Sequence, residues 1–501
     1  MSRFLIVPLA AATAITAAPS HAVSPEDVWR SWHDFLIESY GAELEIGSET
    51  MSGETLTVTD LTMTMEGPDQ SVEAVVSELA FQNIGNGAVR ITLPASIPIA
   101  TAIAIEDDAT GLMTMTMSQP GGSLVASGSS TDIRYDFDYP VMSLGEFTMT
   151  GTDLPEGGIP LTFDMTIAGL TGFMSLAGED VRSYDSKADM DSLTVDVSFS
   201  DPEMDDGPNG RFTLTMSDLS QVATGAFGKI TPGASLSQLV TSGTMQDGRA
   251  THGPVTYSFT MDGPEGNFDV AAAAESGELS ATLGPDGLSY ATTTRKVTAT
   301  VGGSTIPLPP LAFSIDETGG LFSMPVVPGP DPQDFQLVVK LLGLTADDML
   351  WSLFDPGGQL PRDAANLVLD LTGSGVLLAD FTDPAFAEDP DNMEAPGELT
   401  SLTVNELLFS IAGARLAGFG DFDFTTKDGV PTPSGTATLS LSGGNKLIDT
   451  LVGMGLLAEE QAMGARMMLG LFARPDGDDQ LISEIEVTED GQILANGQRI
   501  R

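Results

Sequence analysis

Cysteine is absent from this 501-residue chain, histidine occurs only three times, and aromatic residues make up 6 % of the sequence. The lack of cysteine excludes a disulfide framework, a cysteine-ligated zinc site, an iron–sulfur cluster and a thiol nucleophile. His21 lies in a segment that we expect to be removed, and the two remaining histidines cannot build a three-histidine zinc site. These residue types therefore imply no metal site and no cofactor.

Positive charge is also scarce, because 20 Lys and Arg stand against 71 Asp and Glu and give a formal net charge of -51. Nucleic acid is excluded as a partner, since binding phosphates requires clustered Lys and Arg. Carboxylates scattered over solvated faces are typical of a soluble acidic protein, in which salt screens self-repulsion within about 8–10 Å.

Three acidic turns were candidates for calcium loops, and none has the ligand spacing of an EF-hand. They are Asp201–Gly207, Asp389–Asn392 and Asp476–Asp479. Weak surface Ca²⁺ binding at these turns is left open by the sequence.

Catalytic signatures are missing as well. The chain has no Gly-x-Ser-x-Gly elbow, no Ser-x-x-Lys, no His-Glu-x-x-His and no phosphate-binding Gly-Lys-Ser/Thr. A histidine-dependent triad would have to use His33 or His252, and His252 precedes a Gly-Pro turn. Paired carboxylates are so abundant that they give no specific signal for glycoside hydrolysis. We therefore predict no catalytic residue and no enzyme activity.

The first 22 residues have the features of a secretory signal peptide. Arg3 supplies the positive start, residues 4–18 are apolar or small apart from two threonines, and Ser20-His21-Ala22 fits the small-x-small cleavage pattern. This apolar run is shorter than the ~20 residues that span a bilayer. We expect cleavage after Ala22 and a mature protein that is periplasmic or secreted.

The mature chain is predicted to begin with a helix over residues 25–40. Ser24 and Asp27 form a box-like N-cap around Pro25. Large apolar side chains recur at helical spacing and include two of the three tryptophans: Val28, Trp29, Trp32, Phe35, Leu36 and Tyr40. The polar side of this helix is acidic, which disfavours binding to a membrane surface. We expect the apolar stripe to pack against a sheet.

Between about residues 55 and 325 the hydrophobic period changes from 3.6 to 2. Segments such as Leu61–Met65, Leu193–Val197 and Tyr257–Met261 alternate apolar residues with Thr, Ser or Asp. This alternation predicts antiparallel strands with one dry and one wet face, separated by turns rich in Gly, Pro and Asn. Because the spacing of the strands is irregular, a long meander is expected rather than a strict repeat.

A Pro- and Gly-rich stretch at residues 325–332 predicts a boundary between a β region with its N-terminal helix (23–325) and a C-terminal α+β region (326–501). Residues 333–355 are predicted to be helical. Strands follow as far as residue 441, then a helical hairpin over 445–473 and a last strand pair over 481–495. The whole chain is therefore predicted to be a β-rich α+β protein: a long antiparallel, curved sheet with an N-terminal helix and a C-terminal helical hairpin.

Four segments of the C-terminal third carry a family resemblance. They are Asp347–Asp363, Leu402–Leu407, Gln461–Pro475 and Glu489–Gln498. They resemble a bacterial exported family, domain of unknown function 2125, and the resemblance is strongest over residues 333–501. Nothing catalytic is established for that family, so the resemblance implies no functional residue. Its general build is similar to that of envelope proteins that shelter lipids in a β-groove, which is an analogy of fold.

Two functions are consistent with these patterns, and a third is weaker. The first is a non-catalytic carrier for a hydrophobic, lipid-like ligand, covered by the helical hairpin. The apolar stripes of the hairpin then supply the candidate ligand contacts, Leu451, Val452, Met463 and Met467. The alternative is a structural module that binds a protein of the cell envelope. A carboxylate-dependent hydrolase is the third.

Overall fold

The computed structural model describes residues 22–40, 42–66, 70–104, 110–151, 160–178, 181–200, 209–228, 233–388, 396–427 and 430–501. The expected signal peptide therefore lies outside the described residues except for Ala22, and so do the acidic turns at 201–207 and 389–392. Val23, which follows the expected cleavage site, is buried, and its backbone N–H donates to the carbonyl of Gly128. Cleavage after Ala22 stays a prediction.

Strands contain 67 % of the residues and helices 12 %, which confirms the predicted β-rich fold. The described helices are α1 (Pro25–Tyr40), α2 (Leu236–Thr241), α3 (Asp348–Phe354), α4 (Pro384–Glu388), α5 (Gly444–Gly453) and α6 (Glu459–Phe472). No helix among the described residues is both long and apolar enough to cross a membrane.

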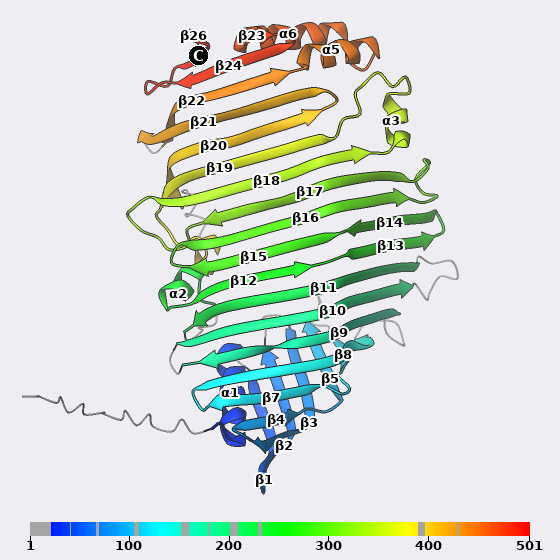
Figure 1. Cartoon of the computed structure of the whole chain (residues 1–501), viewed down its shortest axis with the longest axis vertical. Coiled ribbons are helices and arrows are strands. Elements are labelled where there is room, and N and C mark those ends of the chain that lie inside the picture. Colours follow the sequence, from blue (N-terminus) through cyan, green and yellow to red (C-terminus); the bar gives the residue numbers. More distant parts are fainter. Residues whose placement is uncertain are drawn as a thin grey trace, which may run out of the picture.

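All described strands belong to one antiparallel sheet (Figure 1). The first half consists of β1 (Glu43–Ser52), β2 (Thr55–Glu66), β3 (Gln70–Gly85), β4 (Ala88–Thr92), β5 (Ser96–Ala104), β6 (Thr110–Ser118), β7 (Ser123–Ser129), β8 (Asp132–Gly151), β9 (Leu161–Ala177), β10 (Arg182–Ser200), β11 (Asn209–Phe227), β12 (Met245–His252) and β13 (Val255–Gly263). The second half consists of β14 (Gly266–Ala274), β15 (Ser276–Gly284), β16 (Gly287–Gly302), β17 (Leu311–Met324), β18 (Gln333–Ala346), β19 (Ala365–Leu377), β20 (Gly397–Ile411), β21 (Ala414–Lys427), β22 (Val430–Ser442), β23 (Arg474–Gly477), β24 (Gln480–Val487), β25 (Ile493–Ala495) and β26 (Gln498–Arg499).

The chain runs through this sheet as a meander, as the sequence predicts. Most strands pair with their neighbours in sequence, and some long strands pair with two shorter strands placed end to end. Thus β11 pairs with β13 along its first half and with β12 along its second, while β16 pairs with both β14 and β15. Strands β17 and β18 pair across residues 325–332, so the sheet passes through the predicted domain boundary without interruption. The division into regions 23–325 and 326–501 stays a prediction.

The helix predicted over residues 333–355 is wrong for most of its length, because Gln333–Ala346 is strand β18 and only Asp348–Phe354 is helical. The run Leu341-Leu342-Gly343-Leu344 disguised the alternation of this strand. Gly343 has φ +72°, and this irregularity shifts the register between Leu341 and Leu344. On the N-terminal side of that shift, Phe335, Leu337 and Val339 alternate as strand residues do.

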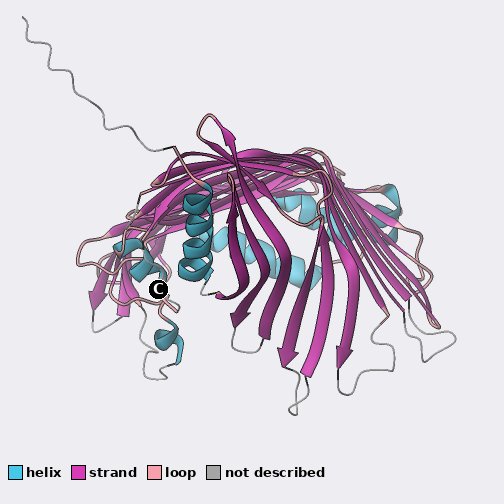
Figure 2. Ribbon diagram, turned by 90° about the horizontal axis from the view of Figure 1, so that it is seen from below, coloured by secondary structure: helices cyan, strands magenta, loops and turns pink. Residues whose placement is uncertain are grey.

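The sheet is bent into an arch, and α1 lies beneath it on the inner side (Figure 2). Residues with positive φ interrupt the pairing of neighbouring strands at adjoining positions. Lys296 (φ 54°) lies in β16 and Gly343 in β18, and Asp316 of the intervening strand β17 lies between them in the register. A Cβ on Gly343 would stand 2.3 Å from the Asp316 carboxylate, so this close approach requires glycine.

The loop after α3 is organised by a buried carboxylate. Asp355 is fully buried, and its two oxygens accept hydrogen bonds from the backbone N–H groups of Gln359 and Leu360, both at 2.9 Å. These two donors hold the pKa of Asp355 below its ordinary value of 3.8.

Asp355→Asn is therefore expected to destabilise the protein in a pH-dependent way. A lowered folded-state pKa means that the carboxylate stabilises the fold above the unfolded-state pKa, and that this contribution is lost as the pH falls through the folded-state pKa. Protonated Asp resembles Asn in shape, so the difference in unfolding midpoint between the two proteins should shrink below about pH 4. Urea unfolding of both proteins at pH 3 and pH 7 measures it, and an equal difference at both values would contradict the argument.

Candidate ligand-binding site

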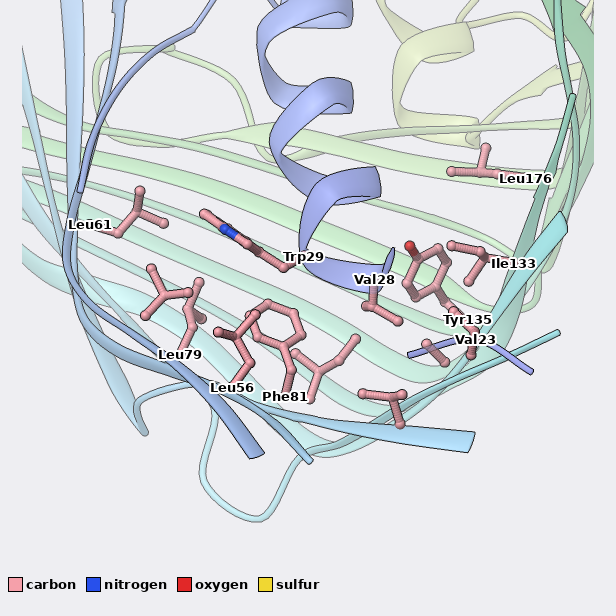
Figure 3. Packing of buried hydrophobic residues seen from close by; sticks show 14 residues of the cluster. Val23, Val28, Trp29, Leu56, Leu61, Leu79, Phe81, Ile133, Tyr135 and Leu176 are labelled. Carbon is pink, nitrogen blue, oxygen red and sulfur yellow. The ribbon is translucent and has the colours of Figure 1, made fainter. Parts of the chain in front are cut away.

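Helix α1 begins as predicted and packs against the first third of the sheet. The Ser24 hydroxyl accepts from the Asp27 N–H at 3.2 Å, and Asp27 accepts in return from the Ser24 N–H at 3.1 Å. Trp29 is buried and lies 5.8 Å from the ring of Phe81 on β3, and its indole N–H donates to Glu49. Figure 3 shows α1 between Leu61 and Leu79 on one side and Ile133 and Leu176 on the other. The prediction that this stripe packs on a sheet is correct.

The packing leaves a cavity of about 520 Å³ between α1 and the inner face of the sheet, which we call the cavity beneath α1. Its lining is almost entirely apolar and comes from α1 together with strands of the sheet: Trp29, Ser31, Trp32, Phe35, Leu36, Leu61, Met63, Val76, Leu79, Leu93, Leu124, Tyr135, Phe137, Tyr139, Met142, Leu170, Met174 and Leu176. Burial raises the pKa of the Tyr139 hydroxyl further above physiological pH, at which a tyrosine is protonated and neutral. A cavity of this size and lining suits an apolar ligand, since small-molecule sites are about 300–1,000 Å³ and mostly apolar.

The wall of this cavity continues across the sheet as a row of uncharged residues. Side chains of residues directly paired across antiparallel strands lie on the same face. Following these pairs from Tyr135 defines the inner row: Tyr135, Met174, Ser186, Ala223, Gly248, Ala281, Tyr290, Phe322, Leu337, Leu371, Val404, Gly420, Ala437 and Ile485. The row runs from β8 to β24 without meeting a charged residue.

The adjacent row, on the opposite face, has the reverse chemistry. We call it the outer row: Arg134, Ser175, Asp185, Thr224, Asp247, Thr282, Ser289, Ser323, Gln336, Thr372, Thr403, Asp421, Thr436 and Glu486. Every residue in it is polar or charged. The outer row is therefore hydrophilic, whereas the inner row continues the wall of the cavity beneath α1.

Large apolar side chains on the inner face are open to solvent well away from α1. Tyr290 is 46 % exposed, Phe322 43 % and Phe409 45 %. Phe409 pairs with Leu367, which in turn pairs with Leu341. Leu341 lies four positions from the inner-row residue Leu337 on β18, so its side chain and those paired with it are on the inner face. A solvent-exposed apolar surface of this kind is typical of a binding surface.

The predicted ligand contacts of the helical hairpin lie in two different environments. Leu451 and Val452 on α5 are half-buried, whereas Met463 and Met467 on α6 are 71 % and 70 % exposed. None of the four lines the cavity beneath α1, and the hairpin lies at the opposite end of the sheet (Figure 1). The structure therefore does not bring the four residues together around one cavity, and their contact with a ligand stays a prediction.

One acidic turn predicted as a weak calcium candidate has a structural role. Asp479 accepts hydrogen bonds from the backbone N–H groups of Asn445 and Lys446 at 3.0 Å, which caps the first turn of α5. Among the described residues, no group of three or more His, Asp or Glu is arranged to hold a metal ion.

Met467→Asp is expected to change the free energy of unfolding by no more than about 0.5 kcal/mol, because surface substitutions away from special contacts have small effects. The high exposure of Met467 is the basis for this expectation. Thermal unfolding of the variant beside the wild type measures it. A large loss of stability would show that Met467 is covered in solution.

Sequence reasoning predicted the apolar stripe of α1 and its packing on a sheet, and missed the cavity between them. Tyr139 pairs with Leu170, and Met142 lies beyond an unpaired position at which Gly169 has φ +64°, so the simple alternation of apolar and polar residues does not continue through this point. The apolar character of each strand segment was visible in the sequence. The tertiary contacts that turn these segments toward α1 were not.

No family model matches the chain, and no curated protein matches it significantly.

Proposed function

We propose that this protein is a non-catalytic carrier of an elongated, lipid-like ligand, which lies along the inner row with one end in the cavity beneath α1. The observation that carries the proposal is the uncharged inner row itself, since it leads away from the apolar cavity for the length of the sheet. A ligand with an acyl chain fits this shape, because an extended apolar molecule would contact successive strands.

Burial of the inner face provides the driving force. Removing apolar surface from water contributes roughly 25 cal/mol per Å². Side chains such as Tyr290 and Phe322 are left nearly half exposed by the fold, so this gain is available to a ligand. The polar outer row keeps the other face of the sheet in water, as a carrier that crosses an aqueous compartment requires.

Export to the periplasm or out of the cell, and membership of the family called domain of unknown function 2125, belong to the same proposal. Both are supported by sequence features alone: the signal-like first 22 residues and the four C-terminal segments. The alternative, a structural module that binds an envelope protein, predicts an inner face that is covered by protein instead of lipid.

Native mass spectrometry of the freshly purified protein tests the proposal, with co-purified lipid mass as the expected result. A photoactivatable monoacylglycerol carrying a diazirine in its chain then locates the site. Crosslinks should fall on peptides of the inner face, and Phe322→Asp should remove those near β17. Ser323→Asp is the matched control, because Ser323 is the neighbouring outer-row residue and pairs only with the uncharged Ser289 and Gln336.

Absence of co-purified lipid together with absence of specific crosslinking would refute the carrier function. The structural-module alternative would then be preferred. Crosslinks distributed equally over both faces of the sheet would also contradict the proposal, since the outer row consists of polar and charged residues.

A further inference from the structure

A second, polar cavity of about 340 Å³ adjoins the apolar cavity beneath α1. The two cavities share Ser31 and Leu176 in their linings. At this seam the Tyr135 hydroxyl donates to the Ser31 hydroxyl at 3.3 Å. Residues on one side of α1 line the apolar cavity, and residues on the adjacent side line the polar one, so an amphiphilic molecule could occupy both.

The polar cavity has an unusual balance of charge for this protein. Its lining includes Arg30 and Arg182 as well as Asp27 and Asp34. Two cations therefore face two anions, in a chain where acidic residues outnumber basic ones by 71 to 20. Burial raises the pKa of Tyr135 at the seam, and the hydrogen bond to Ser31 and, to a smaller extent, the charge of Arg182 oppose that rise.

These charges can exchange partners. Arg30 is 65 % exposed and reaches Asp27 at 3.4 Å, and Asp34 pairs at 3.2 Å with His33, which is charged only when protonated. Exposed pairs of this kind contribute little to stability, so a ligand can replace one member at small cost. A ligand group with both charges matches this lining, since it offers an anion to the arginines and a cation to an aspartate.

We propose that the ligand is an amphiphile with a zwitterionic head of the phosphoethanolamine class, whose phosphate binds Arg30 and Arg182 and whose ammonium binds Asp34, while its chain enters the apolar cavity. This inference rests on the proposed carrier function and names its ligand class. A head with no net charge also avoids the long-range repulsion that the strongly acidic protein exerts on anions.

Three lipids with the same 16-carbon chain test the head group: lysophosphatidylethanolamine, the anionic lysophosphatidylglycerol and the uncharged monopalmitoylglycerol. Affinities are measured by isothermal titration below the micelle concentration of each lipid. The wild type should bind the zwitterionic lipid most tightly. Arg30→Gln and Arg182→Gln should each weaken that binding about tenfold, the scale of one charge-assisted hydrogen bond, and leave monopalmitoylglycerol within about twofold.

Two further variants complete the design. Asp34→Asn should weaken binding of the zwitterionic lipid and strengthen binding of lysophosphatidylglycerol, because it removes a negative charge. Arg249→Gln is the matched control, since Arg249 pairs with Glu278 on the outer side of the sheet and lines neither cavity. It should change none of the three affinities.

Equal wild-type affinity for the three lipids would overturn the zwitterion proposal and leave the carrier function standing. The same holds if the arginine variants weaken all three lipids equally, or if the anionic lipid binds best. Failure of all three lipids to bind would instead overturn the carrier function.

Discussion

Met142→Asp is expected to lower the affinity for an uncharged hydrophobic probe such as N-phenyl-1-naphthylamine by at least about tenfold. Met142 lines the apolar cavity beneath α1. A bound ligand would strip water from the new carboxylate without offering it a hydrogen bond, at a cost of about 1–3 kcal/mol or more. Because 1.4 kcal/mol corresponds to tenfold in affinity, the effect should be plain in a fluorescence titration.

Ser143→Asp is the control for this prediction. It introduces the same charge one residue along β8, on the opposite face, where Ser143 pairs with the uncharged Thr166 and Ser118. Probe affinity should be unchanged. Equal loss of binding in both variants would mean that the probe is sensitive to net charge, and no loss in either would place it outside the cavity.

Phe81→Ala is expected to cost about 3–5 kcal/mol of unfolding free energy, the range for removing a large aromatic side chain from a core. Phe81 is fully buried, and its ring lies 5.8 Å from the rings of both Trp29 and Trp32. The loss should be concentrated around α1, since in an extended meander each strand contacts chiefly its neighbours.

Tryptophan fluorescence can localise that loss. The chain has three tryptophans, two of them on α1, so a background carrying Trp351→Phe reports on α1 alone. In this background Phe81→Ala should lower the midpoint of urea unfolding substantially. Phe419→Ala is the control, because Phe419 is 59 % exposed on the outer face, and it should shift the midpoint little. Similar shifts for the two variants would contradict the assignment of the core.

The helical segments show where sequence information is sufficient. Helix α1 was predicted to begin at Pro25, and the structure confirms both its start and its cap, because the Ser24–Asp27 box is formed within four consecutive residues. The helical hairpin is likewise confirmed as α5 and α6. Local hydrogen bonds and 3.6-residue spacing are properties of short segments, which a sequence displays directly.

Strand β18 shows where sequence information fails. Its apolar residues were compatible with a helix until the pairing with β17 and β19 fixed their spacing, and Gly343 hid the period of two. Pairing partners supply the backbone hydrogen bonds of a strand, so the decision lies outside the segment.

By itself, the sequence determined that most of this chain forms strands with one apolar and one polar face, since alternation is a local property of each segment. Only the tertiary structure decided that the apolar positions of successive strands align into one inner row, because register depends on strand pairing and on register shifts such as the one between Leu341 and Leu344. It alone also placed Arg182 in the cavity that Arg30 lines on α1, since residues so far apart in sequence meet only when the sheet folds over the helix.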